Sequence, residues 1–178
     1  SEPLMSLAEA LLEEAQQASE IADAVIASSL NQAKELWRMR EMMSEVQKHE
    51  GGSIKHDIAV PVARVPEFIE RANQLVELMI QGARPVPFGH LGDGNLHFNL
   101  SEPVGGNAAE FLALAPRIHR AMHDLVAQYG GSFSAEHGIG QLKREELVRY
   151  KHPVALEIMR SIKQALDPKG IMNPGKVL

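Results

Sequence analysis

The chain has 178 residues, 44% of them hydrophobic, and a formal net charge of −5 at pH 7. This size suits one globular domain with a core, and the acidic balance gives no support to a nucleic-acid partner. The absence of cysteine excludes disulfides, thiolate ligands and a cysteine nucleophile. No apolar run approaches the roughly 20 residues of a membrane-spanning helix, and an intracellular setting fits this composition.

The first half of the chain alternates helical and extended patterns. Leucines at helical spacing indicate the first helix, Gly51-Gly52 ends the long second one, and Pro61 stops the strand that follows. Pro66 suits the first turn of the next helix. In chain order we expect a helix over 4–18, a strand over 23–27, a helix over 29–49, a strand over 54–60 and a helix over 66–81.

The second half begins with a hairpin over 86–101. Asn107 is a suitable cap for a helix over 108–129, and Pro116 breaks or kinks that helix. We then expect a strand over 132–135, helices over 140–149 and 153–166, and a type I turn over 167–170. This order predicts an α+β fold in which helices pack on one face of a mostly antiparallel, ferredoxin-like sheet, followed by C-terminal helices.

The hairpin carries the most informative pattern. Asp93-Gly94 predicts a two-residue type I′ turn, because both central residues of that turn need φ > 0. Such a turn would pair His90 with His97, with Cβ atoms about 5 Å apart on one face of the ribbon. Alternation then places Asn95, His97 and Asn99 on that face, and Leu96, Phe98 and Leu100 on the other.

Two imidazoles and one carboxylate form a common ligand set for Zn²⁺ or Fe²⁺. His90, His97 and Glu136 offer that set, and the alternative is a solvated polar sheet face. His137 follows Glu136 directly, and a histidine beside a metal-ligating carboxylate can act as a general base. The alternative for His137 is a local hydrogen bond.

A second candidate constellation combines Arg40, Ser44 and Lys55. Arg40 and Ser44 are four residues apart on the expected helix and share a face, and Lys55 begins the next strand. These groups would clamp a carboxylate if they converge; the alternative is a solvated charged face. His119 and His123 also have helical i,i+4 spacing, but no third ligand is evident, so we expect them on a surface helix.

Three motifs in order resemble the C-terminal domain of FAD-linked oxidases, in the vanillyl-alcohol oxidase superfamily. They are Gly-His-Leu-Gly-Asp-Gly-Asn-Leu-His over 89–97, Ala-Glu-His-Gly-Ile-Gly over 135–140, and Asp-Pro-Lys-Gly-Ile-Met-Asn-Pro-Gly-Lys over 167–176. The similarity runs from about Leu36-Trp37 to the C-terminus. The family includes flavoenzymes that act on D-lactate, D-2-hydroxyglutarate and glycolate.

The resemblance implies roles for individual residues. Its metal-dependent members bind a divalent cation, usually zinc, through the residues that match His90, His97 and Glu136, with His137 as the base. It also implies that Asn99 lies near the substrate, and that Arg40, Ser44 and Lys55 hold the distal carboxylate of a dicarboxylate. The C-terminal residues Asn173 and Lys176 would reach toward the flavin.

The implied activity is oxidation of a D-2-hydroxy acid to the 2-oxo acid by hydride transfer to FAD, with the metal lowering the pKa of the hydroxyl. Residues 1–178 would form the substrate-binding or cap domain. The family's N-terminal FAD-binding domain is absent from this chain, so the chain is either a fragment of a longer one, which we favour, or a separately encoded half, and we expect it to be inactive alone. The implied electron acceptor is a quinone, a cytochrome or an electron-transfer flavoprotein.

The expected location is cytoplasmic, with peripheral attachment to the inner membrane through that acceptor, and a homodimer stays open. Two other functions fit the same ligands. One is a non-catalytic module that binds a divalent metal through His90, His97 and Glu136 without redox chemistry. The other is an Fe²⁺ oxygenase-type site built on the same three residues.

Overall fold

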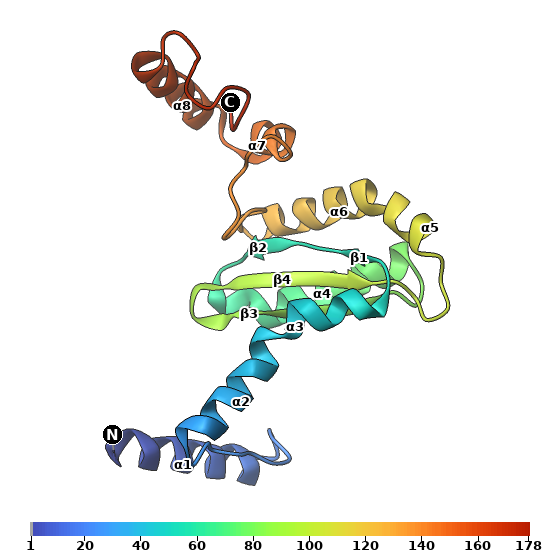
Figure 1. The fold of residues 1–178 in the computed structure, drawn as a ribbon, viewed down its shortest axis with the longest axis vertical. Helices are drawn as coiled ribbons and strands as arrows, with labels where there is room; N and C mark the ends of the chain where they lie inside the picture. Colours follow the sequence, from blue (N-terminus) through green and yellow to red (C-terminus); the bar gives the residue numbers. More distant parts are fainter. Residues whose placement is uncertain (1) are drawn as a thin grey trace. The chain divides into compact units, whose positions relative to one another are not determined.

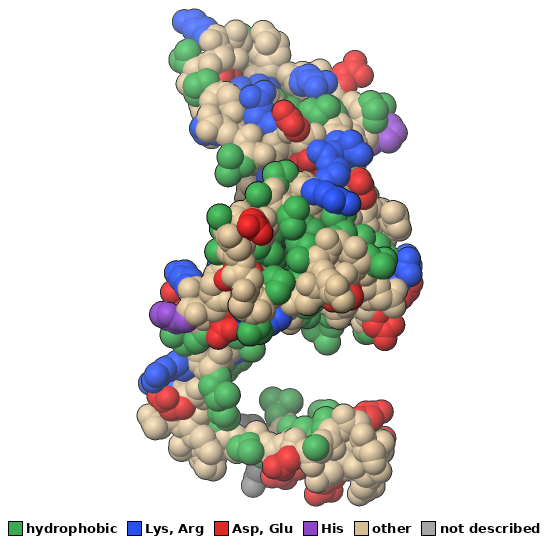
Figure 2. All heavy atoms as spheres, turned by 90° about the vertical axis from the view of Figure 1, so that its right-hand side faces the viewer, with side chains coloured by type: hydrophobic (Ala, Val, Ile, Leu, Met, Phe, Trp, Pro, Cys, Tyr) green, Lys and Arg blue, Asp and Glu red, His purple; other side chains and the backbone are tan. Residues whose placement is uncertain are grey.

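The computed structural model describes residues 2–178, and these form two compact units, one that ends at residue 46 and one over residues 47–178 (Figure 1). The first unit contains helices α1 (Glu2–Gln17), α2 (Leu30–Glu41) and α3 (Met43–Val46). Figure 2 shows hydrophobic side chains at the surface, and those of Leu4 and Trp37 in this unit are 72% and 65% exposed. None of the described helices is long and apolar enough to cross a membrane.

The second unit is built around an antiparallel sheet of β1 (Ser53–Ile54), β2 (Asp57–Ala59), β3 (Arg84–His90) and β4 (Asn95–Ser101). β4 is central: β3 pairs along one edge, and β1 and β2 pair one after the other along the opposite edge. β2 and β3 are therefore parallel to each other with β4 between them. The chain connects them through α4 (Val65–Met79) in a split β-α-β arrangement.

The core joins one face of the sheet to two helices. Alternation along β4 turns Leu96, Phe98 and Leu100 into this core. Figure 1 shows α4 and α6 (Ala115–Gln128) beside the sheet, and the two helices contact each other. The core residues from these helices follow helical spacing; they are Phe68, Ala72 and Val76 on α4, and Ile118, Met122, Leu125 and Val126 on α6.

The remaining elements are short segments around this framework. The 3₁₀ helices are η1 (Gln47–Glu50), η2 (Val62–Arg64) and η3 (Leu91–Asp93), and α5 (Ala108–Ala113) leads into α6. Asn107 caps α5 by accepting from the backbone N–H of Ala109, as the sequence predicts. The C-terminal region contains α7 (Arg144–Tyr150) and α8 (Pro153–Leu166). The mixed α+β class with a small antiparallel sheet is confirmed.

Several predicted boundaries are wrong. The segment 23–27 forms no strand, and Val25 in it is exposed. The helix expected over 29–49 breaks at Met42. The strand expected over 54–60 divides into β1 and β2, and the one over 132–135 is a single bridge from Ser132 to Ala59.

Two helix predictions in the second half also need correction. The helix expected over 108–129 divides at Leu114, two residues before Pro116, as the proline suggested. The helix expected over 140–149 begins only at Arg144. The turn over 167–170 does form, since the N–H of Gly170 donates to the carbonyl of Asp167 at 3.0 Å.

The predicted hairpin exists, but its register differs by two residues. His90 pairs with Asn95 and Phe88 pairs with His97, so the expected His90–His97 pair is wrong. Only Gly94 has a positive φ, of 73°, while Asp93 completes η3. A type I′ turn needs two residues with positive φ. Because this hairpin has one, Gly94, its strands are joined by a longer loop. Because the shift is an even number of residues, both histidines stay on one face.

Candidate functional site

The polar face of the sheet places the two hairpin histidines. His97 lies mid-strand on β4, between Phe88 of β3 and Asp57 of β2, and the Phe88 ring lies 5.1 Å from the imidazole, centroid to centroid. His90 ends β3 on the same face, diagonally placed rather than opposite. The sheet therefore presents both imidazoles on the same polar face, from two adjacent strands.

A tightly bonded loop delivers Glu136 and His137 to the same place. The N–H of Ala135 donates to the carbonyl of Asp57, which extends the edge of β2. The Ser134 hydroxyl donates to the carbonyl of His137 at 2.5 Å and accepts from Nζ of Lys143 at 2.9 Å. These bonds fix the loop although it has no regular secondary structure.

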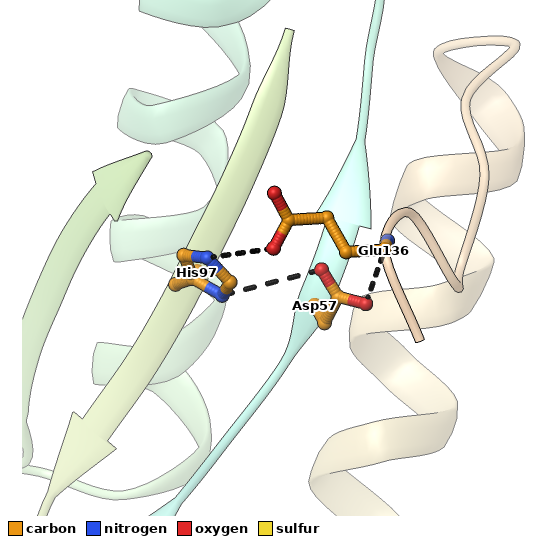
Figure 3. A group of neighbouring side chains, drawn as sticks. All are labelled: Asp57, His97 and Glu136. Carbon is orange, nitrogen blue, oxygen red and sulfur yellow. Dashed lines mark hydrogen bonds and ion pairs between the residues drawn. The ribbon is translucent and has the colours of Figure 1, made fainter. Parts of the chain in front are cut away.

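Glu136 joins the two imidazoles through its two oxygens. Oε1 lies 3.2 Å from Nδ1 of His90, and Oε2 lies 3.5 Å from Nε2 of His97. Figure 3 shows the Glu136 carboxylate directed toward the His97 ring. The three residues predicted as a ligand set thus meet at one carboxylate. Two imidazoles and a carboxylate suit a divalent metal such as Zn²⁺ and leave positions open for substrate or water.

Asp57 is a site residue that sequence reasoning missed. Ligand atoms of Asp57, His97 and Glu136 all lie within 4.8 Å of one another (Figure 3). Burial acts to raise the pKa of the Asp57 carboxyl, but hydrogen bonds from the His137 N–H, the Asn95 side chain and the Glu136 N–H outweigh it and lower that pKa. The sequence did contain a signal for Asp57, because this aspartate lies inside a strand, directly before Ile58. Unpaired carboxylates are rarely buried, so an aspartate at this position indicates that its carboxylate has partners.

The predicted substrate ligands fall in different parts of the chain. Asn99 is buried on β4, and its Nδ2 donates to Oε1 of Gln47 at 2.7 Å. Nε2 of Gln47 is buried without a hydrogen-bond partner among the described residues. Lys55 is exposed between β1 and β2. Arg40 and Ser44 belong to the first unit, on α2 and α3, so the carboxylate clamp stays a prediction.

The C-terminal tail contains Asn173 and Lys176, the two residues that are predicted to contact flavin. Asp167 organises this tail: its carboxylate accepts from the N–H of Ile171 at 3.0 Å, and it also receives Nζ of Lys163 at 2.6 Å. Asn173 has a positive φ of 50°, a conformation that asparagine tolerates better than most residues. Lys176 lies just before Val177, whose N–H donates to the carbonyl of Gly140 at 2.8 Å. The roles of Asn173 and Lys176 toward flavin stay predictions.

The expectation that His119 and His123 lie on a surface helix is wrong. His123 is buried and His119 is partly buried, and with His56 they form a cluster on the helix side of the sheet. Nδ1 of His56 donates to the carbonyl of Phe98 at 2.8 Å, so Nε2 accepts from Nδ1 of His119 at 3.0 Å.

This cluster favours neutral imidazoles. Burial, together with the nearby His119, lowers the pKa of His56 to about 3. Burial also lowers the pKa of His119 and of His123, although Glu146 opposes it by accepting from Nδ1 of His123 at 2.9 Å. Helical spacing does not encode which strand faces α6, so the cluster could not be predicted from the positions of its histidines in the chain.

Comparison with known proteins adds a second line of evidence. The family model described as "FAD linked oxidases, C-terminal domain" matches residues 4–177. The match begins well before Leu36, where the motif resemblance begins.

Similar curated proteins come from bacteria, animals and plants. D-2-hydroxyglutarate dehydrogenase of Stutzerimonas stutzeri (strain A1501) is 38% identical over 88% of this chain and 34% of its own length. The mitochondrial D-2-hydroxyglutarate dehydrogenase of Danio rerio is 38% identical over 94% of this chain and 30% of its own length. The mitochondrial D-2-hydroxyglutarate dehydrogenase of Arabidopsis thaliana is 40% identical over 89% of this chain and 27% of its own length. The chain thus spans about a third or less of these relatives.

Proposed function

The chain belongs to the family of FAD-linked oxidase C-terminal domains, and we propose that it forms the substrate-binding part of an FAD-dependent D-2-hydroxyacid dehydrogenase. The single observation that carries this proposal is the meeting of His90, His97 and Glu136, with His137 beside them. D-2-Hydroxyglutarate is the substrate that we favour. Similar proteins bear its name, and Arg40 and Lys55 offer cationic groups for a second carboxylate.

His90, His97 and Glu136 would hold a divalent metal, for which Zn²⁺ is the first choice because it accepts mixed nitrogen and oxygen ligands. When bound, the metal supplies Lewis acidity toward the substrate hydroxyl, and FAD supplies the acceptor for the hydride. FAD would be held mainly by polypeptide outside this chain, with Asn173 and Lys176 contributing from its C-terminal tail.

The residues of the chain would perform the remaining steps. Arg40, Ser44 and Lys55 would bind and orient the distal carboxylate, and Asn99 would lie near the substrate. His137 would accept the hydroxyl proton, since its side chain is 69% exposed and it directly follows Glu136, the proposed metal ligand, in the chain. The electron acceptor would be a quinone, a cytochrome or an electron-transfer flavoprotein. We place the protein in the cytoplasm or at the inner membrane surface, with a homodimer as one assembly.

The proposal is tested by anaerobic flavin reduction in a complete enzyme that combines this chain with an FAD-binding domain. We expect D-2-hydroxyglutarate to bleach the flavin absorbance, and His137→Ala to slow this step about 100-fold or more, because general bases contribute about 10²–10⁴ in rate. The matched control is His49→Ala, which changes an exposed histidine of the same unit. Absence of flavin reduction with D-2-hydroxyglutarate, D-lactate and glycolate alike would overturn the proposal.

A non-catalytic metal-binding module is the second candidate. It is favoured by one observation: the ligand set lies entirely within this chain and needs no flavin domain to assemble. Zinc binding without any flavin reduction would support the module, and flavin reduction that depends on His97 would exclude it.

A further inference from the structure

Asp57 is the most deeply buried acidic group at the site, with 3% of its side chain exposed. Its carboxylate oxygens face three groups that the proposed function uses: the imidazole of His97, the imidazole of His137 and the peptide that joins Glu136 to His137. The ligand atoms of Asp57, His97 and Glu136 lie within 4.8 Å of one another, but both oxygens of Asp57 already accept hydrogen bonds, Oδ1 from Asn95 and Oδ2 from the N–H groups of Glu136 and His137. We propose that Asp57 is a positioning residue that fixes the His137 base and the His97 ligand, an inference that rests on the proposed function.

Asp57 binds the backbone of the loop that carries Glu136 and His137. Oδ2 of Asp57 accepts hydrogen bonds from the N–H of Glu136 at 3.0 Å and from the N–H of His137 at 2.7 Å. Two hydrogen bonds to one buried, ionised oxygen are stronger than bonds between neutral groups. The backbone of the 136–137 pair is therefore held from β2, across 79 residues of sequence.

Asp57 also faces the His137 ring. Nδ1 of His137 lies 3.4 Å from Oδ2 of Asp57, whereas the rest of the ring extends into solvent. An ionised carboxylate can only accept, so its position favours the tautomer of His137 that carries the proton on Nδ1. Nε2 is then left with a free lone pair on the exposed side. A base held by a third, buried group is the usual arrangement for an imidazole that takes a proton from substrate.

His97 also faces Asp57. Its Nδ1 lies 4.0 Å from Oδ1 of Asp57, and its Nε2 lies 3.5 Å from Glu136 (Figure 3). Asp57 and Glu136 therefore lie at opposite nitrogens of one ring. With Nε2 as the metal-binding atom, Asp57 lies on the side of the ring from which a carboxylate commonly supports a metal-ligating histidine, although 4.0 Å is longer than a hydrogen bond. Asn95 holds Oδ1 in place through a hydrogen bond of 3.2 Å.

The test reads the protonated nitrogen of each ring directly. In ¹⁵N NMR spectra of the metal-free chain at alkaline pH, we expect His137 to be predominantly the Nδ1–H tautomer. In Asp57→Ala, we expect its tautomer ratio to move to that of the exposed His49. The matched control is Glu146→Gln, which alters another carboxylate–histidine pair of the same unit and should leave His137 unchanged. An Nε2–H tautomer of His137 in the unaltered chain would overturn the proposal even if Asp57→Ala failed to fold.

Zinc affinity gives an independent readout for His97. We expect Asp57→Asn, which keeps the shape of the side chain, to weaken Zn²⁺ binding about 10- to 100-fold, the usual effect of removing a supporting carboxylate. Unchanged affinity would remove the role toward His97. These outcomes can be separated from those of the proposed function. If His137 has the Nδ1–H tautomer but the flavin is not reduced, the dehydrogenase proposal is refuted and Asp57 remains the positioning group.

Discussion

At the scale of single residues, Glu136 is the group on which the candidate site depends. It comes from an irregular loop, yet it contacts imidazoles from β3 and β4 through its two oxygens. The neighbouring His137 is held by the same loop and by Asp57. A change at Glu136 should therefore affect ligand binding much more than folding, because its side chain is about half exposed.

The first prediction concerns zinc binding. We expect Glu136→Gln to weaken Zn²⁺ binding about 100-fold or more, since a neutral amide oxygen is a poorer ligand than a carboxylate and even supporting groups contribute about 10- to 100-fold. Isothermal titration calorimetry on the chain measures this. Glu157→Gln, at an exposed position on α8, is the matched control and should bind as the unaltered chain does. Equal affinity in both variants would remove Glu136 from the ligand set.

The second prediction concerns the tail. Asp167 accepts from the N–H of Ile171 and of Met172, so Asp167→Ala should speed hydrogen exchange at these amides. We expect an increase of about tenfold, the order that corresponds to loss of one hydrogen bond. Mass spectrometry of the C-terminal peptide provides the measurement. If exchange there does not change, Asp167 does not order the segment that contains Asn173.

At the scale of elements, the hairpin shows how one glycine determines a register. A side chain at Gly94 would need φ of 73° and would place Cβ 1.9 Å from the carbonyl oxygen of Val60. Gly92, two residues earlier in the same loop, has no positive φ, and a Cβ at this position would meet no atom within 4 Å. A side chain is therefore accommodated at Gly92 but not at Gly94.

We expect Gly94→Ala to lower the free energy of unfolding by about 2–4 kcal/mol, because left-handed strain and a backbone clash act together. Gly92→Ala should change it by no more than about 0.5 kcal/mol. Urea denaturation of both variants provides the comparison. Similar midpoints for the two would contradict the loop geometry.

The histidine cluster between β2 and α6 predicts a pH dependence. The pKa of His56 is lowered to about 3 by burial, whereas in the unfolded chain it lies near 6.5. Below about pH 6.5 the unfolded state binds more protons, so stability is complete above that pH and falls as the pH falls toward 3. From His56 alone we expect a loss of about 2 kcal/mol at pH 5.

Denaturation at pH 7.5 and pH 5 of the unaltered chain and of His56→Gln tests this prediction. His56→Gln should reduce the difference between the two conditions, and His49→Gln, at an exposed position, should not. A pH dependence that is the same in all three proteins would show that the buried ring does not resist protonation.

Elements with strong local signals were predictable. The proline and apolar spacing of α4, the alternation along β4 and the Asn107 cap all act within a few residues. The register of the hairpin was not, because Asp93-Gly94 satisfies a type I′ turn in composition while Asp93 adopts a 3₁₀ conformation. Asp57 was missed for a related reason: its partners are 38 to 80 residues away, and no local pattern encodes them.

At the scale of the whole molecule, the division into two units has a direct consequence for stability. The core cluster contains buried residues from Ile54 to Tyr129 and includes none of the described residues of the first unit. Residues 47–178 should therefore fold without residues 1–46. We expect the thermal midpoint of the shortened chain to lie within about 4–8 °C of the full chain, a range that corresponds to about 1 kcal/mol.

Near-UV circular dichroism of the shortened chain measures this through the buried Tyr129. The cut is placed before Gln47 because its Oε1 accepts from Asn99 in the second unit. Loss of the cooperative transition would show that the first unit contributes to the core. The same protein, titrated with Zn²⁺, also shows whether the predicted ligand set needs Arg40 or Ser44.

His56 and Asp57 are consecutive residues whose side chains emerge on opposite sides of the sheet, where β2 begins. If β2 slipped by one position against β4, the imidazole would enter the polar face and the ionised carboxylate would enter the apolar interior. Desolvating that charge without its donors is so unfavourable that the misaligned sheet would scarcely be populated. His56 and Asp57 together therefore disfavour a shifted register of β2, and this effect does not depend on any substrate.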